Sequence, residues 1–189
     1  MSEVAFRAVA ENCAPGVAPE ILSKLVSAES GFNMFAIGVN GANRRSYAPK
    51  TAKEAAALAR ELIAQGHSID MGLGQINSVN LEWLKLTPET VFDACTNLAA
   101  AETVLRDGYE RARAAGASKE DALGKALSAY NTGSFTRGFD NGYVARVMDR
   151  DVRTAPIESQ SINLTDQADS SARWDVFGSS GSSSALVFN

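Results

Sequence analysis

Apolar residues recur at helical spacing along most of the chain, up to about residue 147. In the segment 19–29, Leu22, Leu25 and Val26 fall on one face of a helix, and Pro19 stands at a position typical of a helix start. The same spacing predicts further helices, which cover residues 53–65, 96–115, 118–130 and 143–147. The β signal is scattered, and Asn40-Gly41 indicates one hairpin between residues 37 and 46. The pattern therefore predicts a mainly α domain with a small β-hairpin or irregular insertion.

The composition changes near residue 152, which divides the chain into residues 1–151 and residues 152–189. The second part holds nine serines in 38 positions, against ten serines in the preceding 151, and it shows no helical or alternating period. We therefore expect a folded domain followed by a disordered tail. Two apolar clusters interrupt the tail: Trp174, Val176 and Phe177, and then Leu186, Val187 and Phe188. The tail fits either an untethered terminus or a segment that docks on a partner or is processed.

Length and charge exclude several classes of protein. A chain of 189 residues with 45% hydrophobic residues can bury a core without a dense disulfide framework. With 18 Lys and Arg against 22 Asp and Glu, the chain lacks the basic surface of a nucleic-acid binder or of a protein that binds anionic membranes. No apolar run reaches the ~18 residues of a membrane span. The start of the chain shows no basic region followed by an apolar stretch, so no signal peptide is visible.

Glu29 carries the most chemical information in the sequence. It lies four residues after Leu25, so it continues the apolar face of its helix, which then ends at Ser30-Gly31. A carboxylate that faces an apolar environment is expected to have a raised pKa, because desolvation disfavours the charged form. A general acid needs this property near neutral pH. The spacing alone also fits a glutamate at a helix end that turns to solvent or pairs with an arginine.

The stretch Asp70-Met-Gly-Leu-Gly-Gln-Ile-Asn77 is the second unusual feature. Its glycines allow the backbone to approach another group closely, and Gln75 and Asn77 offer donors and acceptors to a neutral polar ligand such as a sugar. By itself the stretch also fits an ordinary turn. It contains no glycine pattern that would indicate phosphate binding.

The third feature is Ala129-Tyr-Asn-Thr-Gly133, which stands at the end of a predicted helix. Tyr130 lies three residues after Leu127, so its ring can pack inside while its hydroxyl reaches a cleft. Taken alone, the same position fits a core tyrosine near a glycine that ends the helix.

The order of these motifs is more specific than any one of them. Glu29-Ser30, Gly72-Leu-Gly-Gln-Ile-Asn77 and Ala129-Tyr-Asn-Thr-Gly133 together resemble the soluble lytic transglycosylase family, which has a lysozyme-like fold. Through Ala36-Ile-Gly-Val-Asn-Gly41 and Phe92-Asp-Ala-Cys-Thr-Asn-Leu98, the chain is more closely similar to the lytic transglycosylase component of type IV secretion systems. The resemblance covers about residues 5–150 and does not include the tail.

The resemblance implies a role for each matched residue. Glu29 would be the catalytic acid and base. The residues that would contact the substrate are Ser30, Gln75, Asn77, Tyr130, Asn131 and Tyr143, of which Tyr143 is the weaker match. The chain departs from the family at Gly38, because many members have a serine nine residues after the glutamate. Residues 39–69 form a long insertion, which we expect to be a flap or helix over the groove.

The implied reaction is cleavage of the β-1,4 bond between N-acetylmuramic acid and N-acetylglucosamine, with formation of 1,6-anhydro-muramic acid, to open the cell wall for a type IV secretion system. If Asp70 faces Glu29 and holds a water, the enzyme would instead be a hydrolytic muramidase. A peptidoglycan-binding assembly scaffold and a phage-associated lysin are further alternatives. No cofactor is expected. No metal site is expected either, because His67 is the only histidine and no carboxylate cluster replaces it.

Cys13 and Cys95 are candidates for a disulfide in such an enzyme. Cys13 precedes the Glu29 helix and Cys95 stands at the start of the third helix, so a disulfide would tie the N-terminal segment to the bundle. Two free buried thiols are the alternative. Since persistent disulfides form in oxidising compartments, a bridge would agree with action on peptidoglycan in the bacterial periplasm. The expected partners are glycan strands and, through the tail, other secretion components.

Overall fold

The computed structural model describes residues 3–42 and 44–148, in which seven α-helices and one short 3-10 helix accompany four strands. The helices are α1 (Glu3–Cys13), α2 (Pro19–Ser30), α3 (Ala52–Ala64), α4 (Ala94–Ala114), α5 (Lys119–Thr132), α6 (Arg137–Asp140), α7 (Tyr143–Met148) and η1 (Ser78–Asn80). The strands are β1 (Ile37–Val39), β2 (Arg45–Tyr47), β3 (Ile69–Met71) and β4 (Ile76–Asn77). The prediction of a mainly α fold is confirmed.

The helix that carries Glu29 begins and ends as its sequence indicates. Pro19 occupies the first turn of α2, and Gly31 closes the helix with a left-handed φ of 56°. Other predicted helices start at side-chain caps, since Ser118 accepts a hydrogen bond from the backbone N–H of Asp121 at the start of α5. Helix α1 was not predicted, although it buries Phe6 and Ala10.

The strands form one antiparallel sheet in the order β2-β1-β3-β4. Strands β1 and β2 are the predicted hairpin, whereas the sequence did not reveal β3 and β4. Gly38 of β1 pairs with Asp70 of β3, and Asp70 pairs with Asn77 of β4. The glycine-rich stretch is thus a tight connection between two strands, and it holds polar side chains at the edge of the sheet.

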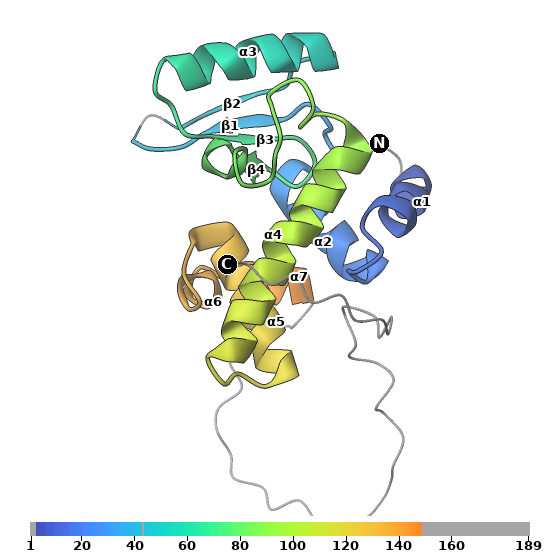
Figure 1. Cartoon of the computed structure of the whole chain (residues 1–189), viewed down its shortest axis with the longest axis vertical. Helices are drawn as coiled ribbons and strands as arrows, with labels where there is room; N and C mark the ends of the chain where they lie inside the picture. Colours follow the sequence, from blue (N-terminus) through green and yellow to red (C-terminus); the bar gives the residue numbers. More distant parts are fainter. Residues whose placement is uncertain (1–2, 43, 149–189) are drawn as a thin grey trace, which may run out of the picture.

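Figure 1 shows the sheet between α3 and the rest of the helices. The long helix α4 runs from the sheet to α5, and α6 and α7 pack beside α5. The apolar faces of these elements form one core, which includes Leu25, Leu98 and Leu127. Among the described residues, no helix combines the length and the hydrophobicity that crossing a membrane requires.

The insertion at residues 39–69 matches our expectation of a flap or helix over the groove only in part. It forms β2 and α3, but no residue of α3 lines the cavity described below. Helix α3 instead packs on the sheet and buries an apolar stripe that includes Ala55, Ala59 and Leu62. Helix α3 therefore does not cover the groove, because its apolar stripe packs on the sheet. Asn40, Arg44 and Ser68 of the same insertion line the cavity, which agrees with the alternative of a flap.

Cys13 and Cys95 form a disulfide, with their Cα atoms 5.1 Å apart. The bridge joins the last residue of α1 to the first turn of α4. The predicted tail, with its two apolar clusters, lies outside the described residues.

Candidate active site

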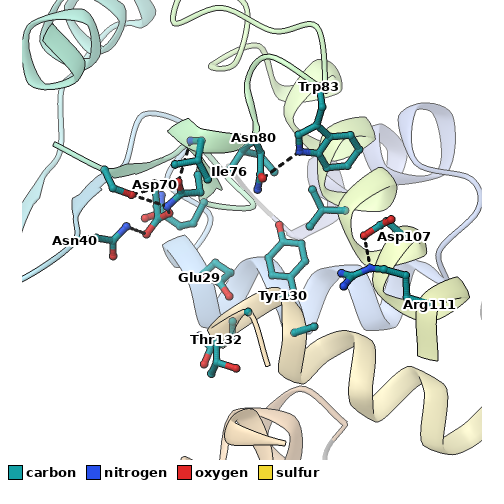
Figure 2. A pocket seen from close by; sticks show the side chains of 18 of the residues that line it. Glu29, Asn40, Asp70, Ile76, Asn80, Trp83, Asp107, Arg111, Tyr130 and Thr132 are labelled. Atoms are coloured by element: carbon teal, nitrogen blue, oxygen red, sulfur yellow. Dashed lines mark hydrogen bonds and ion pairs between the residues drawn. The ribbon is translucent and has the colours of Figure 1, made fainter. Parts of the chain in front are cut away.

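A cavity of about 750 Å³ opens between the sheet and the helices α4 and α5. Figure 2 shows Glu29 and Tyr130 near its middle, with Asn40 and Asp70 on one side and Trp83 and Arg111 on the other. This volume is typical of ligand pockets. The predicted site residues that line the cavity are Glu29, Gln75, Asn77, Tyr130 and Asn131.

Glu29 is partly buried at the C-terminal end of α2. Burial raises its pKa to about 7, and the nearby charge of Asp70 adds to the rise, whereas the bond from Tyr143 and the charge of Arg146 oppose it. Near neutral pH the protonated and the ionised carboxyl group are therefore both populated. A carboxyl group in this state can donate a proton and later accept one.

Tyr143 is the direct hydrogen-bond partner of Glu29. Its hydroxyl, at the start of α7, lies 2.5 Å from Oε1 of Glu29. Burial raises the pKa of Tyr143, and the neighbouring Glu29 adds to this rise, so the phenol stays protonated and donates. The alternatives in which Glu29 turns to solvent or pairs with an arginine are not what the structure contains.

Asp70 is a second carboxylate on the cavity wall. Its Oδ2 accepts a hydrogen bond from Asn40 Nδ2 at 2.8 Å, and its Oδ1 accepts one from Asn77 Nδ2 at 2.7 Å. Burial raises the pKa of Asp70, while the two amides oppose this rise. Asn77 Nδ2 also donates to Ser68 Oγ at 3.1 Å, so the network fixes the amide that we expect to contact the substrate.

The connection between β3 and β4 is held by hydrogen bonds from two side-chain amides. Asn97 of α4 accepts from the N–H of Gly74 at 2.7 Å and donates to the carbonyl of Met71 at 3.0 Å. The side chain of Gln75 donates to the carbonyls of Gly72 and Ala36. A methyl group added at Gly72 would lie 2.3 Å from Asn97 Nδ2, so the loop has no room for a larger residue there.

Tyr130 reaches the same loop from α5. Its hydroxyl donates to the carbonyl of Gly74 at 2.6 Å, and burial raises its pKa well above the ordinary value. Because its proton is engaged in this bond, the hydroxyl oxygen retains lone pairs that can face the cavity.

The remaining sequence-predicted positions lie differently. Ser30 does not line the cavity, and its hydroxyl donates to the carbonyl of Val26 within its own helix at 3.3 Å. Asn131 lines the cavity and accepts from Asn141 at 2.9 Å. At Gly38, a Cβ atom would lie 3.2 Å from Oε1 of Gln75, so the Gln75 amide occupies the space beside the position where many family members have a serine.

A family model described as the transglycosylase SLT domain matches residues 7–151. The chain belongs to this family. It is a peptidoglycan lytic transglycosylase, and the order of its motifs and its partly buried glutamate agree with this assignment. No solved structure matches the chain.

Curated relatives of this SLT transglycosylase carry the name virB1. Protein virB1 of Rhizobium radiobacter is 37% identical over 180 residues, which cover 95% of this chain and 74% of the relative. Protein virB1 of Agrobacterium fabrum is 35% identical over 182 residues, covering 94% and 72%. The type IV secretion system protein virB1 of Brucella suis is 39% identical over 161 residues, covering 82% and 67%.

Several cavity residues of this SLT transglycosylase were missed by sequence reasoning. They are Asn40, Arg44, Ser68, Ile76, Val79, Asn80, Trp83, Val104, Asp107 and Arg111. Asn40 was read as a turn residue and as part of the Ala36–Gly41 motif, but not as a residue of the site. Asp107 and Arg111, spaced four apart on α4, have the spacing of an ordinary surface ion pair.

Proposed function

We propose that Glu29 is the single catalytic acid and base of this lytic transglycosylase. The observation that carries this assignment is the place of Glu29 on the wall of a cavity of about 750 Å³, where its pKa is raised to about 7 and the Tyr143 hydroxyl donates a hydrogen bond to it. The bond cleaved is the β-1,4 linkage between N-acetylmuramic acid and N-acetylglucosamine. The product carries a 1,6-anhydro-muramic acid end.

In the first step, protonated Glu29 gives its proton to the glycosidic oxygen as the bond to the anomeric carbon breaks. The carbonyl oxygen of the muramic N-acetyl group bonds to that carbon, so positive charge spreads onto the acetamido nitrogen. A lone pair of the Tyr130 hydroxyl can accept the acetamido N–H, because its own proton is engaged by Gly74.

In the second step, ionised Glu29 accepts the proton of the C6 hydroxyl. The C6 oxygen then bonds to the anomeric carbon and displaces the N-acetyl oxygen, which closes the anhydro ring. Glu29 ends the cycle protonated, so one carboxyl group serves both steps. Tyr143 stabilises the ionised form between them through its hydrogen bond.

Asp70 is the residue that would support hydrolysis instead. Each oxygen of Asp70 already accepts an amide hydrogen bond, so this carboxylate has fewer lone pairs left for a water and is less basic than an unpaired one. We therefore assign Asp70 to holding Asn40 and Asn77. Mass spectrometry of digested peptidoglycan tests the choice: anhydro ends are expected from the wild type and from Asp70→Asn, and reducing muramic ends would contradict the transglycosylase reaction.

Replacing Tyr143 with phenylalanine is expected to shift the pH dependence of cleavage. The first step needs protonated Glu29, so kcat/KM is retained below the pKa of this residue and falls as pH rises through it. Tyr143 holds this pKa down, so its removal should move the falling limb to higher pH. Tyr47→Phe, which changes a tyrosine outside the cavity, serves as the control. If the fall of kcat/KM in Tyr143→Phe stays at the same pH or moves to lower pH, the hydrogen bond from Tyr143 does not lower the pKa of Glu29 as assigned.

We also propose that the enzyme acts in the periplasm and opens the wall for a type IV secretion system. The names of the virB1 relatives support the secretion role, and the Cys13–Cys95 bridge supports an oxidising compartment. We propose contacts between the tail and other secretion components. Deleting residues 152–189 and measuring cleavage and secretion separately tests these contacts, because secretion should fall while cleavage persists.

A further inference from the structure

The turn between α6 and α7 connects the candidate active site to a residue outside the cavity. Asn141 follows the last residue of α6 and Tyr143 begins α7, so only Gly142 separates them. The hydroxyl of Tyr143 lies 2.5 Å from Oε1 of Glu29. Asn141 does not line the cavity, and its side chain takes no part in the proposed catalytic steps. The way in which this turn is fixed therefore sets the position of the Tyr143 hydroxyl.

The side-chain amide of Asn141 forms hydrogen bonds in two directions. Its Oδ1 accepts a hydrogen bond from the backbone N–H of Tyr143 at 2.9 Å. The first N–H groups of a helix have no partner within the helix, so this bond satisfies one of them and fixes the first turn of α7. Its Nδ2 donates to Oδ1 of Asn131, in the last turn of α5, at 2.9 Å. One amide thus ties the start of α7 to the end of α5, and these helices lie side by side in Figure 1.

The two hydrogen bonds allow only one orientation of each amide. A backbone N–H can only donate, so Asn141 must turn its oxygen toward Tyr143 and its nitrogen toward Asn131. Asn131 must then accept with its own oxygen, which leaves its NH2 group for other partners. Asn131 lines the cavity, so the polarity of this position on the cavity wall is set by a residue outside the cavity.

The backbone of Asn141 adds a third contact beside Tyr143. Its carbonyl oxygen accepts a hydrogen bond from Nη1 of Arg146 at 3.3 Å. The guanidinium of Arg146 lies 5.9 Å from the centre of the Tyr143 ring. The turn therefore holds the tyrosine and its neighbouring positive charge together.

The groups that act on Glu29 come from α7, β3 and α5. Burial raises the pKa of Glu29, the hydrogen bond from Tyr143 and the charge of Arg146 lower it, and the charge of Asp70 adds to the rise. On α5, burial raises the pKa of Tyr130, so its hydroxyl stays neutral. Both groups that lower the pKa of Glu29 belong to α7. If the start of α7 is not held in place, both effects weaken and the pKa of Glu29 rises.

We propose that Asn141 is a positioning residue for the cleavage reaction: its amide holds Asn131 on the cavity wall and Tyr143 beside Glu29 in one arrangement. This role rests on the proposed function of Glu29, and it adds a residue that lies outside the cavity. Asn131 and Asn141 are both exposed, so their mutual hydrogen bond competes with water and adds little stability. A substitution of Asn141 should therefore disturb the site more than the fold.

Steady-state cleavage of soluble peptidoglycan strands over a range of pH by Asn141→Ala tests this role. We expect kcat to fall about fivefold, as for the loss of a helix-start hydrogen bond. The fall of kcat/KM should move to higher pH, as in Tyr143→Phe, because the hydroxyl is no longer held against Glu29.

Asn141→Ser separates the two hydrogen bonds of the amide. Serine keeps an oxygen that can accept from the N–H of Tyr143, but its side chain is too short to reach Asn131. The pH profile and kcat of this variant should therefore match the wild type. Its KM should rise about threefold, because the Asn131 amide is released.

Two further variants distinguish positioning from a loss of structure. Asn12→Ala removes an exposed asparagine side chain of α1 outside the cavity, and it should leave kcat, KM and the pH profile unchanged. Adding Asn141→Ala to Tyr143→Phe should cause no further shift with pH, since the hydroxyl that Asn141 positions is already absent. Thermal unfolding should give melting temperatures close to the wild type for the Asn141 variants.

The outcomes separate this role from the proposed function. If Tyr143→Phe shifts the pH profile and Asn141→Ala does not, Asn141 does not position the tyrosine and the inference is wrong. A loss of kcat in Asn141→Ala that is equal at every pH and comes with a lower melting temperature would show a purely structural role, which also overturns it. If Glu29→Gln cleaves normally, the proposed function fails, and the positioning role fails with it.

Discussion

Replacing Glu29 with glutamine is expected to lower the rate of peptidoglycan cleavage by roughly a thousandfold. Glutamine has nearly the same shape, so it keeps the packing of α2, but it can neither donate a proton to the glycosidic oxygen nor accept one from the C6 hydroxyl. Among the described residues, two other carboxyl groups line the cavity, those of Asp70 and Asp107. Asp70 accepts hydrogen bonds from two amides, and Asp107 forms an ion pair with Arg111, so neither is placed to replace Glu29. Release of anhydro-muropeptides from purified sacculi measures the loss.

Glu110→Gln provides the matched control, because Glu110 is an exposed glutamate of α4 that does not line the cavity. It should cleave at the wild-type rate. If Glu29→Gln retains activity within about tenfold of the wild type, a second acid must exist and the single-residue mechanism is wrong. Measuring secretion in the same strains separates an enzymatic role from a scaffold, since a scaffold would secrete normally with this variant.

The same substitution should also raise stability, in a pH-dependent way. The pKa of Glu29 is raised from 4.5 to about 7 in the fold. Below pH 4.5 the carboxyl group of Glu29 is protonated in both the folded and the unfolded chain. As pH rises toward about 7 the unfolded chain releases its proton first, so the free energy of unfolding falls. By linkage the loss is complete above about pH 7 and amounts to roughly 3 kcal/mol. Glu29→Gln should therefore unfold at higher denaturant concentration than the wild type near pH 8, and at a similar concentration near pH 4.

The sequence predicted the place of Glu29 because helical spacing is a local property. Four residues separate it from Leu25, so the face of α2 was readable without knowing what packs on it. Its partner Tyr143 stands 114 residues away. Family resemblance pointed to this tyrosine, but the bond itself depends on how α7 packs against α2, and no local pattern encodes that packing.

The missed strands had too little sequence to be recognised. Strands β3 and β4 have three and two residues, and a period of two cannot be established over so short a length. The glycine-rich stretch correctly indicated a close approach of backbone, which proved to be the contact of Gly74 with Asn97 and Tyr130. Helix α1 was readable, since Phe6, Val9 and Ala10 have helical spacing. The sequence could not show whether a helix or a flap of residues 39–69 lies over the groove, because it shows that α3 has an apolar face but not which surface buries that face.

Replacing Cys13 and Cys95 with serine is expected to lower the free energy of unfolding by about 4 kcal/mol. The bridge closes a sequence separation of 82, and on the chain-entropy model its loss frees the unfolded chain. For a domain of this size the melting temperature should fall on the order of 10 °C. Cleavage at low temperature should persist, because the bridge does not line the cavity. Calorimetry with and without reductant measures the effect, and reductant should leave the serine variant unchanged.

Local consequences of the same change should appear first at α1. Helix α1 is held by the disulfide and by the edge-to-face contact of Phe6 with Phe32, whose ring centres are 5.2 Å apart. In the loop after α1, the backbone N–H of Gly16 also donates a hydrogen bond to the Glu102 side chain of α4. Phe32 directly follows the end of α2, so loosening α1 releases the segment just beyond Glu29. Hydrogen exchange should therefore rise in α1 and residues 31–35 before the rest of the fold. Two thiols that react with a labelling reagent in denatured, unreduced wild type would contradict the bridge and remove its support for an oxidising compartment.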